Sequence, residues 1–344
     1  MSALRKVLAF ATVVAVAALL APTPAPAASA ARVGRRSACD GLQALRVPAM
    51  AGCTHGGDAT PVAAGGRRIS HRPRVAGPPA PCVGNGSSGR RVLVMYGYPT
   101  GTTNRADIMR PLIRESVALA DLNLDLATPA VAGQHYRFFC RNDAVVSVRT
   151  LKLAPIGSDA AYTFDDVVGS LTNQVSAGLG SVDFRDPRFV YAVFVDNIGC
   201  CYAWGGQASI MADDQPDPTL NANNQQWPGN ARYSMIRLGF DASTEATIFQ
   251  HEVGHNVGAV QDTAPHSSGA FHCYDGYDIM CYADGGPFFQ AGGAMTYDCP
   301  HQTDGLAVFD CGGDDYYSAA PPSGSFLESH WNVANSAWLT SDAA

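Results

Sequence analysis

The stretch His251-Glu252-Val253-Gly254-His255 places two imidazoles four residues apart, with a carboxylate between them. In a helix of about 3.6 residues per turn, that spacing puts both imidazoles on one face, where they can bind one metal ion. Zinc is the metal that such nitrogen ligands favour. Glu252 is offset from both histidines, so it can hold the water that completes an open three-ligand site. The motif predicts a hydrolytic zinc centre, unless it is a chance match on an ordinary helix.

The residues that follow carry a family resemblance. Gly258 lies three residues after His255, where glycine can end the helix in the left-handed conformation. The pattern HExxHxxG, followed later by residues 278–282 (DIMCY), resembles the metzincin zinc endopeptidases and their methionine turn. The resemblance implies that Met280 lies beneath the metal and that Tyr282 reaches the site.

The third metal ligand departs from the family pattern. The family's third histidine usually follows the glycine by three residues, where this chain has Gln261. An amide oxygen is a poor zinc ligand beside imidazole, which leaves Asp262, His266 and His272 as candidates. We favour His272, because its spacing to the methionine turn resembles the archaemetzincin arrangement. His266 is the main rival.

The expected chemistry uses Glu252 as a general base. Zinc on His251, His255 and His272 would lower the pKa of its water towards ~7, and Glu252 would accept the proton as the water attacks a peptide carbonyl. Glu252 would then deliver that proton to the leaving amine, while zinc stabilises the oxyanion. The phenol of Tyr282 would donate a further hydrogen bond. Its alternative role is that of a buried aromatic beside a disulfide.

Three functions fit these residues. The resemblance implies a secreted zinc-dependent endopeptidase that acts on protein or peptide substrates. The alternatives are a secreted non-catalytic binding protein on a metalloprotease scaffold, and a zinc amidohydrolase that acts on a cell-wall polymer. Glu252 favours an enzyme because the motif needs it for chemistry and not for metal affinity, whereas Gln261 favours the binding protein.

The first 30 residues predict secretion. Arg5 and Lys6 form a charged start, residues 7–20 form an apolar run with threonine, and residues 28–30 (ASA) offer a small-x-small cleavage site. That run is too short for a comfortable membrane span, and no later segment approaches the ~20 apolar residues that a span needs. We expect an extracellular monomer without stable membrane insertion.

The cysteines agree with an oxidising compartment. Ten cysteines follow the signal, so most or all should pair as disulfides. We predict the local pairs Cys273 with Cys281 and Cys299 with Cys311, because each closes a short loop in a glycine-rich region. The adjacent residues 200–201 are expected to reach distant partners. A cysteine-ligated metal site is disfavoured, since no CxxC pair occurs.

Residues 31–91 form a basic leader. They hold ten Arg and two Asp, are rich in Gly, Pro and Ala, and lack a sustained apolar period, so we expect a loose fold. The leader is either a propeptide that shields the active site or a linker. Residues 67–68 and 90–91, both Arg pairs, are plausible processing points. A leader cysteine would be able to reach zinc as a thiolate, although a disulfide is favoured.

Residues 92–344 form an acidic body. They carry eleven Lys and Arg against 28 Asp and Glu, a net charge of −17, so we expect no nucleic-acid partner. Asp310, Asp314 and Asp315 gather three carboxylates that could hold calcium through oxygen ligands. A solvated acidic turn is the alternative, because the EF-hand spacing is absent.

Apolar patterns predict strands alternating with helices. The expected strands are 92–98, 136–140, 145–153, 188–196 and 233–240, and the expected helices are 106–127, 163–179, the motif helix capped by Asp241 or Ser243, and a closing helix at 331–339. This order predicts an α+β fold with one main core. The metzincin resemblance implies a twisted mixed sheet with helices in an upper subdomain, residues 92–258, and an irregular disulfide-stapled lower subdomain, residues 259–344.

Overall fold

The fold is available as a computed structural model. The structure describes residues 39, 42–47, 52–59, 79–127, 133–141, 145–155, 162–173, 184–196, 204–226, 230–299 and 306–341. By compactness the chain divides into Met1–Arg36 and Ser37–Ala344, and all described residues belong to the second unit. The expected signal at residues 1–30 and the cysteines at 200–201 lie outside the described residues.

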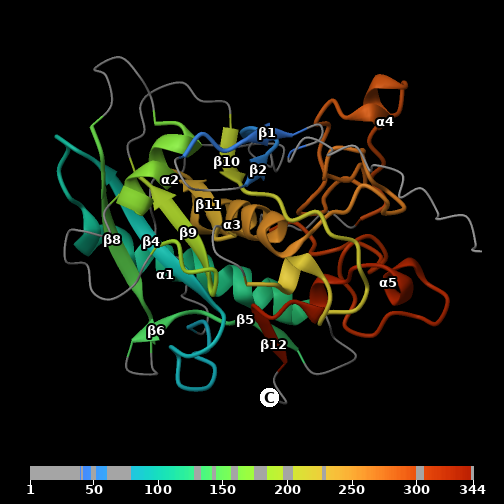
Figure 1. The fold of residues 1–344 in the computed structure, drawn as a ribbon, viewed down its shortest axis with the longest axis horizontal. Helices are drawn as coiled ribbons and strands as arrows, with labels where there is room; N and C mark the ends of the chain where they lie inside the picture. The colour runs from blue at the N-terminus through green and yellow to red at the C-terminus, as the bar shows by residue number, and fades with distance from the viewer. Residues whose placement is uncertain are drawn as a thin grey trace, which may run out of the picture. The chain divides into compact units, whose positions relative to one another are not determined.

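A mixed six-stranded sheet is the main element of this unit (Figure 1). Its strand order is β3 (Asp58–Ala59), β10 (Trp204–Ala208), β11 (Arg232–Arg237), β9 (Phe189–Val195), β4 (Arg91–Pro99) and β8 (Val148–Leu153). The last four run parallel, whereas β10 is antiparallel to β11 and β3 is antiparallel to β10. Two-stranded pairs join β1 (Gln43–Ala44) with β2 (Cys53–Thr54), β5 (Gln134–Tyr136) with β12 (Leu339–Ser341), and β6 (Cys140–Arg141) with β7 (Val145–Val146).

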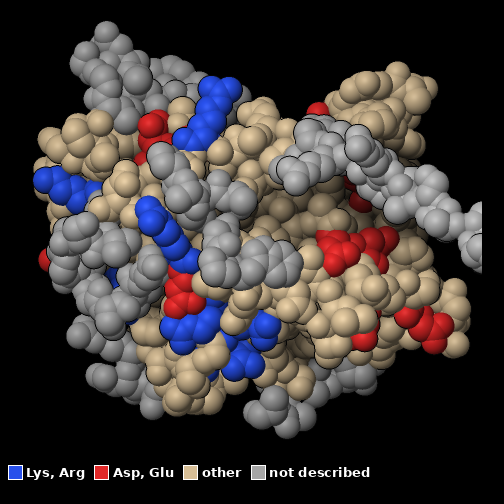
Figure 2. Space-filling view, viewed as in Figure 1, with Lys and Arg blue, Asp and Glu red and all other residues tan. Residues whose placement is uncertain are grey.

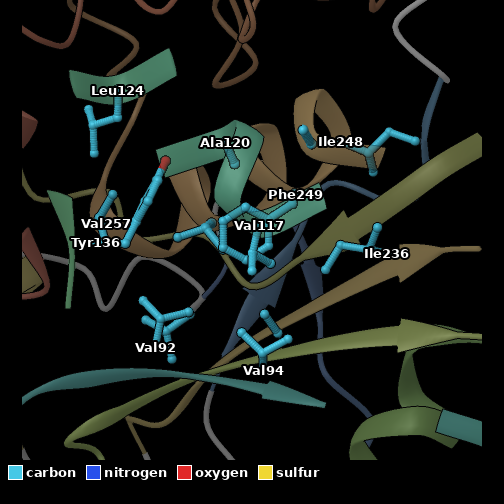
Figure 3. Packing of buried hydrophobic residues seen from close by; sticks show 14 of the residues in the cluster. Val92, Val94, Val117, Ala120, Leu124, Tyr136, Ile236, Ile248, Phe249 and Val257 are labelled. Carbon is cyan, nitrogen blue, oxygen red and sulfur yellow. The ribbon is translucent and has the colours of Figure 1, made fainter. Parts of the chain in front are cut away.

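Helices cover both faces of the sheet. Those that pack on the sheet are α1 (Ala106–Leu126), α2 (Phe164–Asn173) and α3 (Ala242–Val257). The short α4 (Pro287–Gln290) and α5 (Phe326–Ser329) lie apart from it, and the 3-10 turns are η2 (Ala222–Asn224) and η3 (Val333–Asn335). Successive side chains of a strand point to opposite faces. Val92 and Val94 therefore pack with Phe249 against α1 and α3 (Figure 3), while Leu93 and Met95 pack on the face covered by α2.

Most predicted elements of the upper part are confirmed. The strands predicted at 92–98, 188–196 and 233–240 are β4, β9 and β11, and the helix predicted at 106–127 is α1. The strand predictions at 136–140 and 145–153 each correspond to two shorter strands, β5 with β6 and β7 with β8. The predicted helix at 163–179 is α2 as far as Asn173, and its predicted continuation, residues 174–179, lies outside the described residues.

The closing helix predicted at 331–339 is wrong. That segment forms η3 and then β12, which pairs with β5. The Asn332 side chain accepts a hydrogen bond from the Ala334 amide at 3.0 Å and starts the short turn. The Trp331 indole donates to the Val257 carbonyl at 2.9 Å, and the Trp338 indole donates to the Arg188 carbonyl at 3.0 Å. Two anchors on different elements hold the segment in a non-helical path.

Two other predictions need correction. β10 is missing from the predicted strands, because its sequence WGGQA contains two glycines and little apolar surface. The leader is not uniformly loose: β1, β2 and β3 all belong to it, and β3 is an edge strand of the central sheet. The structure therefore ties part of the basic leader to the acidic body.

Disulfides join the described cysteines in pairs. They are Cys39–Cys53, Cys82–Cys140, Cys273–Cys281 and Cys299–Cys311. The two local pairs predicted in the lower part are confirmed. All three leader cysteines are in disulfides, which confirms the favoured prediction and leaves none of them as a thiolate ligand for a metal. Over the described ranges, no helix combines the length and apolar character that crossing a bilayer requires.

The segment after α3 differs in charge and regularity. Residues 259–344 contain eleven Asp and Glu and no Lys or Arg. On the face drawn in Figure 2, Lys and Arg gather over the sheet, while the part that carries α4 and α5 shows acidic side chains only. Its described regular elements are four-residue helices, one 3-10 turn and β12, so other interactions must hold it together.

Candidate metal centre

The motif residues lie on α3, a helix with clear limits. The Asp241 side chain accepts a hydrogen bond from the Thr244 amide at 2.9 Å and caps the first turn. Gly258 ends the helix with a φ of 94°, in the left-handed region where glycine carries no side-chain penalty. Every residue from Glu245 to Val257 is buried, because α3 packs between α1 and the strands β10 and β11. The helix is a rigid platform for its polar side chains.

Two glycines let other residues approach the motif closely. A Cβ on Gly254 would lie 2.7 Å from the Met280 sulfur, so glycine in the middle of the motif lets Met280 pack directly against the helix. A Cβ on Gly206 of β10 would overlap the carboxylate of Glu252. The strand β10 therefore passes immediately beside the predicted general base.

Three histidines converge on one point. His251 Nε2 and His255 Nε2 are 3.2 Å apart, and the His272 ring centroid lies 5.2 Å from that of His251 and 4.9 Å from that of His255. Two nitrogens that bind one tetrahedral zinc at about 2.0–2.1 Å are separated by roughly 3.3 Å. The separation of the first two nitrogens fits a shared ion.

Each histidine is oriented by a hydrogen bond at its other nitrogen. His251 Nδ1 donates to the Ile279 carbonyl at 2.7 Å, and His255 Nδ1 donates to the Ala259 carbonyl at 3.1 Å. His272 Nδ1 lies 3.0 Å from the Asp284 carboxylate. Such partners fix the ring and leave the Nε2 lone pair free for a metal.

Buried atoms at this point lack the partners that burial demands. His272 Nε2, Glu252 Oε2 and Asp58 Oδ2 are all buried without a hydrogen bond among the described residues. Leaving such groups unpaired costs about 1–3 kcal/mol each, and more when they are charged. A cation in their midst would satisfy all three, so the donor set fits zinc and several of its side chains could hold a metal ion.

The third histidine comes from the irregular part of the chain. His272 follows Phe271, which has a left-handed φ of 64° and whose amide donates to Asp262 Oδ1 at 2.9 Å. The Cys273–Cys281 disulfide and the hydrogen bond from the Cys273 amide to the Met280 carbonyl, 3.2 Å, join this turn to the methionine turn. His272 and Met280 are thus fixed together.

The rival ligands lie elsewhere. His266 is outside the cluster and contacts Asp314 and Asp315. Gln261 donates to the Gly258 carbonyl at 2.7 Å and closes the turn after the helix, while Asp262 holds the turn before His272. Of the candidates for a third ligand, the structure brings His272 to His251 and His255.

Tyr282 lies at the cluster. Its ring centroid is 4.5 Å from that of His272 and 5.9 Å from that of His251. Its hydroxyl donates to Asp58 Oδ1 at 2.6 Å. Burial and then the Asp58 carboxylate raise the pKa of this phenol far above its usual value, so Tyr282 remains a hydrogen-bond donor.

Two leader residues join the site, and sequence reasoning missed both. His55 Nε2 is 3.0 Å from His255 Nε2, and Asp58 Oδ1 is 3.2 Å from His272 Nε2. The Asp58 side chain is only 2% exposed. The available signal was a pair of metal-ligating side chains three residues apart in a leader that holds only two acidic residues.

The electrostatics of the cluster follow from its burial. Burial and then the Asp58 carboxylate raise the pKa of Glu252 well above its usual value, while burial and then the neighbouring histidines lower the pKa of His255. Burial also lowers the pKa of His55 to about 4. The pKa of His272 instead rises to about 9, because its hydrogen bonds with Asp284 and Asp58 outweigh the effect of burial, and the pKa of Asp58 falls well below its usual value beside His55 and His251. The cluster thus holds an ionised carboxylate, a ligand type that binds a cation.

The expected calcium ligands divide between two roles. The Asp310 carboxylate accepts backbone amides of Asp314, Asp315 and Tyr316 at 3.2, 3.4 and 2.7 Å, and that of Tyr317, so it organises its own turn. Asp314 and Asp315 instead face His266, in a group that could also hold a metal. Calcium prefers oxygen ligands, so the histidine makes this group a poor match.

Function is inferred from the geometry of the site, because the comparisons with known proteins found no match: no protein-family model and no curated protein matches the chain.

Proposed function

We propose that the chain is a zinc-dependent endopeptidase of the metzincin type. The observation that carries this proposal is the meeting of His251, His255 and His272 beside the buried carboxylate of Glu252. The contacts of Met280 with Gly254 and of Tyr282 with His272 support it, because the family resemblance expects both residues at the metal. The disulfides of the described chain favour an extracellular setting.

The protein residues divide the chemistry between them. Zinc, when bound, would polarise a substrate carbonyl and acidify an attacking water. Glu252 accepts the proton of that water and transfers it to the leaving amine, a role that suits a carboxylate whose pKa burial has raised. Tyr282 donates its hydroxyl to the developing oxyanion.

The sheet edge supports a peptide as substrate. β3 pairs antiparallel with β10, and Asp58 is in register with Gly206 immediately beside Glu252. An extended chain therefore already lies along this edge at the site. Addition of a strand to a sheet edge is a common mode of peptide recognition. An amide within a peptide fits this arrangement better than one in a cell-wall polymer.

A non-catalytic binding protein is the second candidate. It is favoured by His55 and Asp58, which fill the side of the cluster that a catalytic site keeps open. A metal ion coordinated by five side chains would have no open position for a substrate and would have a structural role. The two candidates differ in whether Glu252 matters for turnover.

Glu252→Gln separates the two candidates. We expect the wild-type chain, after brief treatment with trypsin to cut the leader and inhibition of the trypsin, to cleave a mixed peptide library. Glu252→Gln should retain its zinc and lose at least ~100-fold in rate, because loss of a general base commonly costs that much. Glu245→Gln, on the same helix but away from the histidines, is the matched control and should cleave like the wild type. Zinc-loaded chains that cut nothing after leader removal would contradict the proposal.

A further inference from the structure

We propose that residues 53–59 of the leader, called the plug here, supply two further metal ligands, His55 and Asp58, that block the open side of the site. This inference rests on the proposed function, since a blocked position matters only where substrate must enter. The plug lies in a segment whose composition predicts no structure. All of its residues are described, and they belong to the same compact unit as the histidines.

The two side chains of the plug face all three histidines. His55 Nε2 is 3.0 Å from His255 Nε2, Asp58 Oδ1 is 3.2 Å from His272 Nε2, and Asp58 Oδ2 is 3.5 Å from His251 Nε2. Atoms that share a metal at about 2 Å are separated by about 3–3.5 Å. Asp58 Oδ2 has no hydrogen-bond partner among the described residues, although it is buried. Its position is that of a metal ligand.

Asp58 also lies against two side chains that the proposed reaction uses, Tyr282 and Glu252. It accepts the Tyr282 hydroxyl at 2.6 Å, so that phenol is unavailable to a substrate oxyanion. It forms a possible metal-binding group with His251 and Glu252, in which the three ligand atoms lie within 4.8 Å of one another. The plug therefore fills the space where water and substrate carbonyl would sit between Glu252 and Tyr282.

The plug is anchored by more than these two side chains. The Ile210 amide donates to the Cys53 carbonyl at 2.8 Å, and the Gln207 side chain donates to Thr54 Oγ1 at 3.0 Å. Upstream, Leu45 and Val47 are buried in the same apolar cluster as α2. Backbone pairing and core packing therefore hold the plug in addition to its two ligand side chains.

The disulfides define where a break can release the plug. Cys39–Cys53 joins the plug to an earlier leader residue and does not tie it to the body, whereas Cys82–Cys140 ties the end of the leader to β6. Hydrolysis of one peptide bond between Ala59 and Cys82 would thus leave the plug bound by non-covalent contacts alone. Residues 67–68, an Arg pair, lie in this interval. Arg91 is buried at the start of β4, so the pair at 90–91 is poorly placed for cleavage.

Cobalt substitution tests the ligand assignment without any assay of activity. The visible absorption of Co²⁺ in the intact chain should change in position and intensity for His55→Ala/Asp58→Ala, because the number of ligands falls. Zinc should also pass to a chelator at least tenfold faster from this variant. Asp58→Asn, which keeps the side-chain shape, should change the spectrum in the same direction. His266→Ala, a histidine outside the cluster, is the control and should match the wild type.

Each outcome decides a different part of the proposal. Spectra and zinc release that match the wild type in the double variant would overturn the assignment of His55 and Asp58 as ligands. A changed spectrum with peptide cleavage at least tenfold faster, without trypsin, would support both the plug and the peptidase. A changed spectrum with no cleavage would keep the ligands and overturn the peptidase, leaving a structural metal in a binding protein.

Discussion

The parts of the molecule before and after Gly258 contribute to one metal centre by different means. Before it, a continuous apolar core holds α1 and α3 on a six-stranded sheet and places His251, Glu252 and His255 on a rigid helix. After it, disulfides and side-chain hydrogen bonds to the backbone place His272 and its neighbours. The second part also buries Met280, Phe309 and Trp331 in the same core, but the turn that carries His272 depends in addition on these specific bonds.

This difference predicts different responses to mutation. Core substitutions in the first part should lower the stability of the whole domain and spare the local geometry of the site. Substitutions of cross-links and polar partners in the second part should disturb metal binding more than stability. The predictions below compare the two parts, from the largest expected effect to the smallest.

Phe249→Ala should cause the largest loss of stability. Phe249 is fully buried on α3 and lies 6.0 Å from Phe194 and 5.5 Å from Tyr136, between ring centroids. Removal of a buried phenylalanine ring costs about 3–5 kcal/mol. Phe288→Ala, in the half-buried α4 of the second part, should cost about 1 kcal/mol by comparison. Denaturant unfolding measures both, and equal losses would contradict the contrast between the two parts.

Glu245 should give the first part a pH-dependent stability. Burial raises its pKa from 4.5 to about 7, so the folded chain binds this proton more tightly than the unfolded chain. The unfolding free energy should therefore fall by roughly 3 kcal/mol as the pH rises from below 4.5 to above 7. Glu245→Gln should remove this part of the fall. Parallel stability curves for wild type and variant between pH 4 and 8 would refute it.

Loss of the Cys273–Cys281 disulfide should affect the second part. In Cys273→Ser/Cys281→Ser the unfolded chain gains the entropy of a loop with a sequence separation of eight, worth about 2–3 kcal/mol. The turn that holds His272 and Met280 should loosen, so zinc affinity should fall as well. Calorimetry and zinc titration of the same samples measure the two effects. A lower stability with unchanged zinc affinity would show that the turn is held by other contacts.

Asp284→Asn should weaken zinc binding with little effect on stability. Asp284 orients His272 through Nδ1 and also accepts Ser268 Oγ at 2.6 Å. Loss of a carboxylate partner behind a ligating histidine typically costs 10- to 100-fold in metal affinity. Competition with a zinc chelator measures the change, and a Kd within twofold of wild type would show that Asp284 does not position the ring.

The sequence predicts the first part better than the second for a physical reason. Strands β4, β9 and β11 and helix α1 are long apolar runs or periods, and these are the signals that a sequence displays directly. β10 escaped prediction because Gly206 makes room for Glu252 and the two glycines of the strand leave no apolar pattern. The end of the chain was predicted as a helix because the bonds of Trp331 and Trp338 to distant carbonyls leave no local signal.

The site divides in the same way. His251, Glu252 and His255 follow from helical spacing, and the resemblance to archaemetzincins selected His272, which lies at the cluster. His55 and Asp58 could not be predicted, because they reach the cluster through pairing between strands almost 150 residues apart in the chain. Spacing reveals ligands that share an element, and tertiary pairing brings in the others.

The most direct test of the central claim is the zinc content of chains that lack one histidine. The measurement is best made in the His55→Ala/Asp58→Ala background, where the leader cannot replace a lost ligand. After equilibration with equimolar zinc and gel filtration, elemental analysis should find about one zinc in this background and in its His266→Ala derivative. The His272→Ala derivative should retain far less. Full zinc in the His272→Ala chain, with loss in the His266→Ala chain, would contradict the convergence of His251, His255 and His272 on one metal.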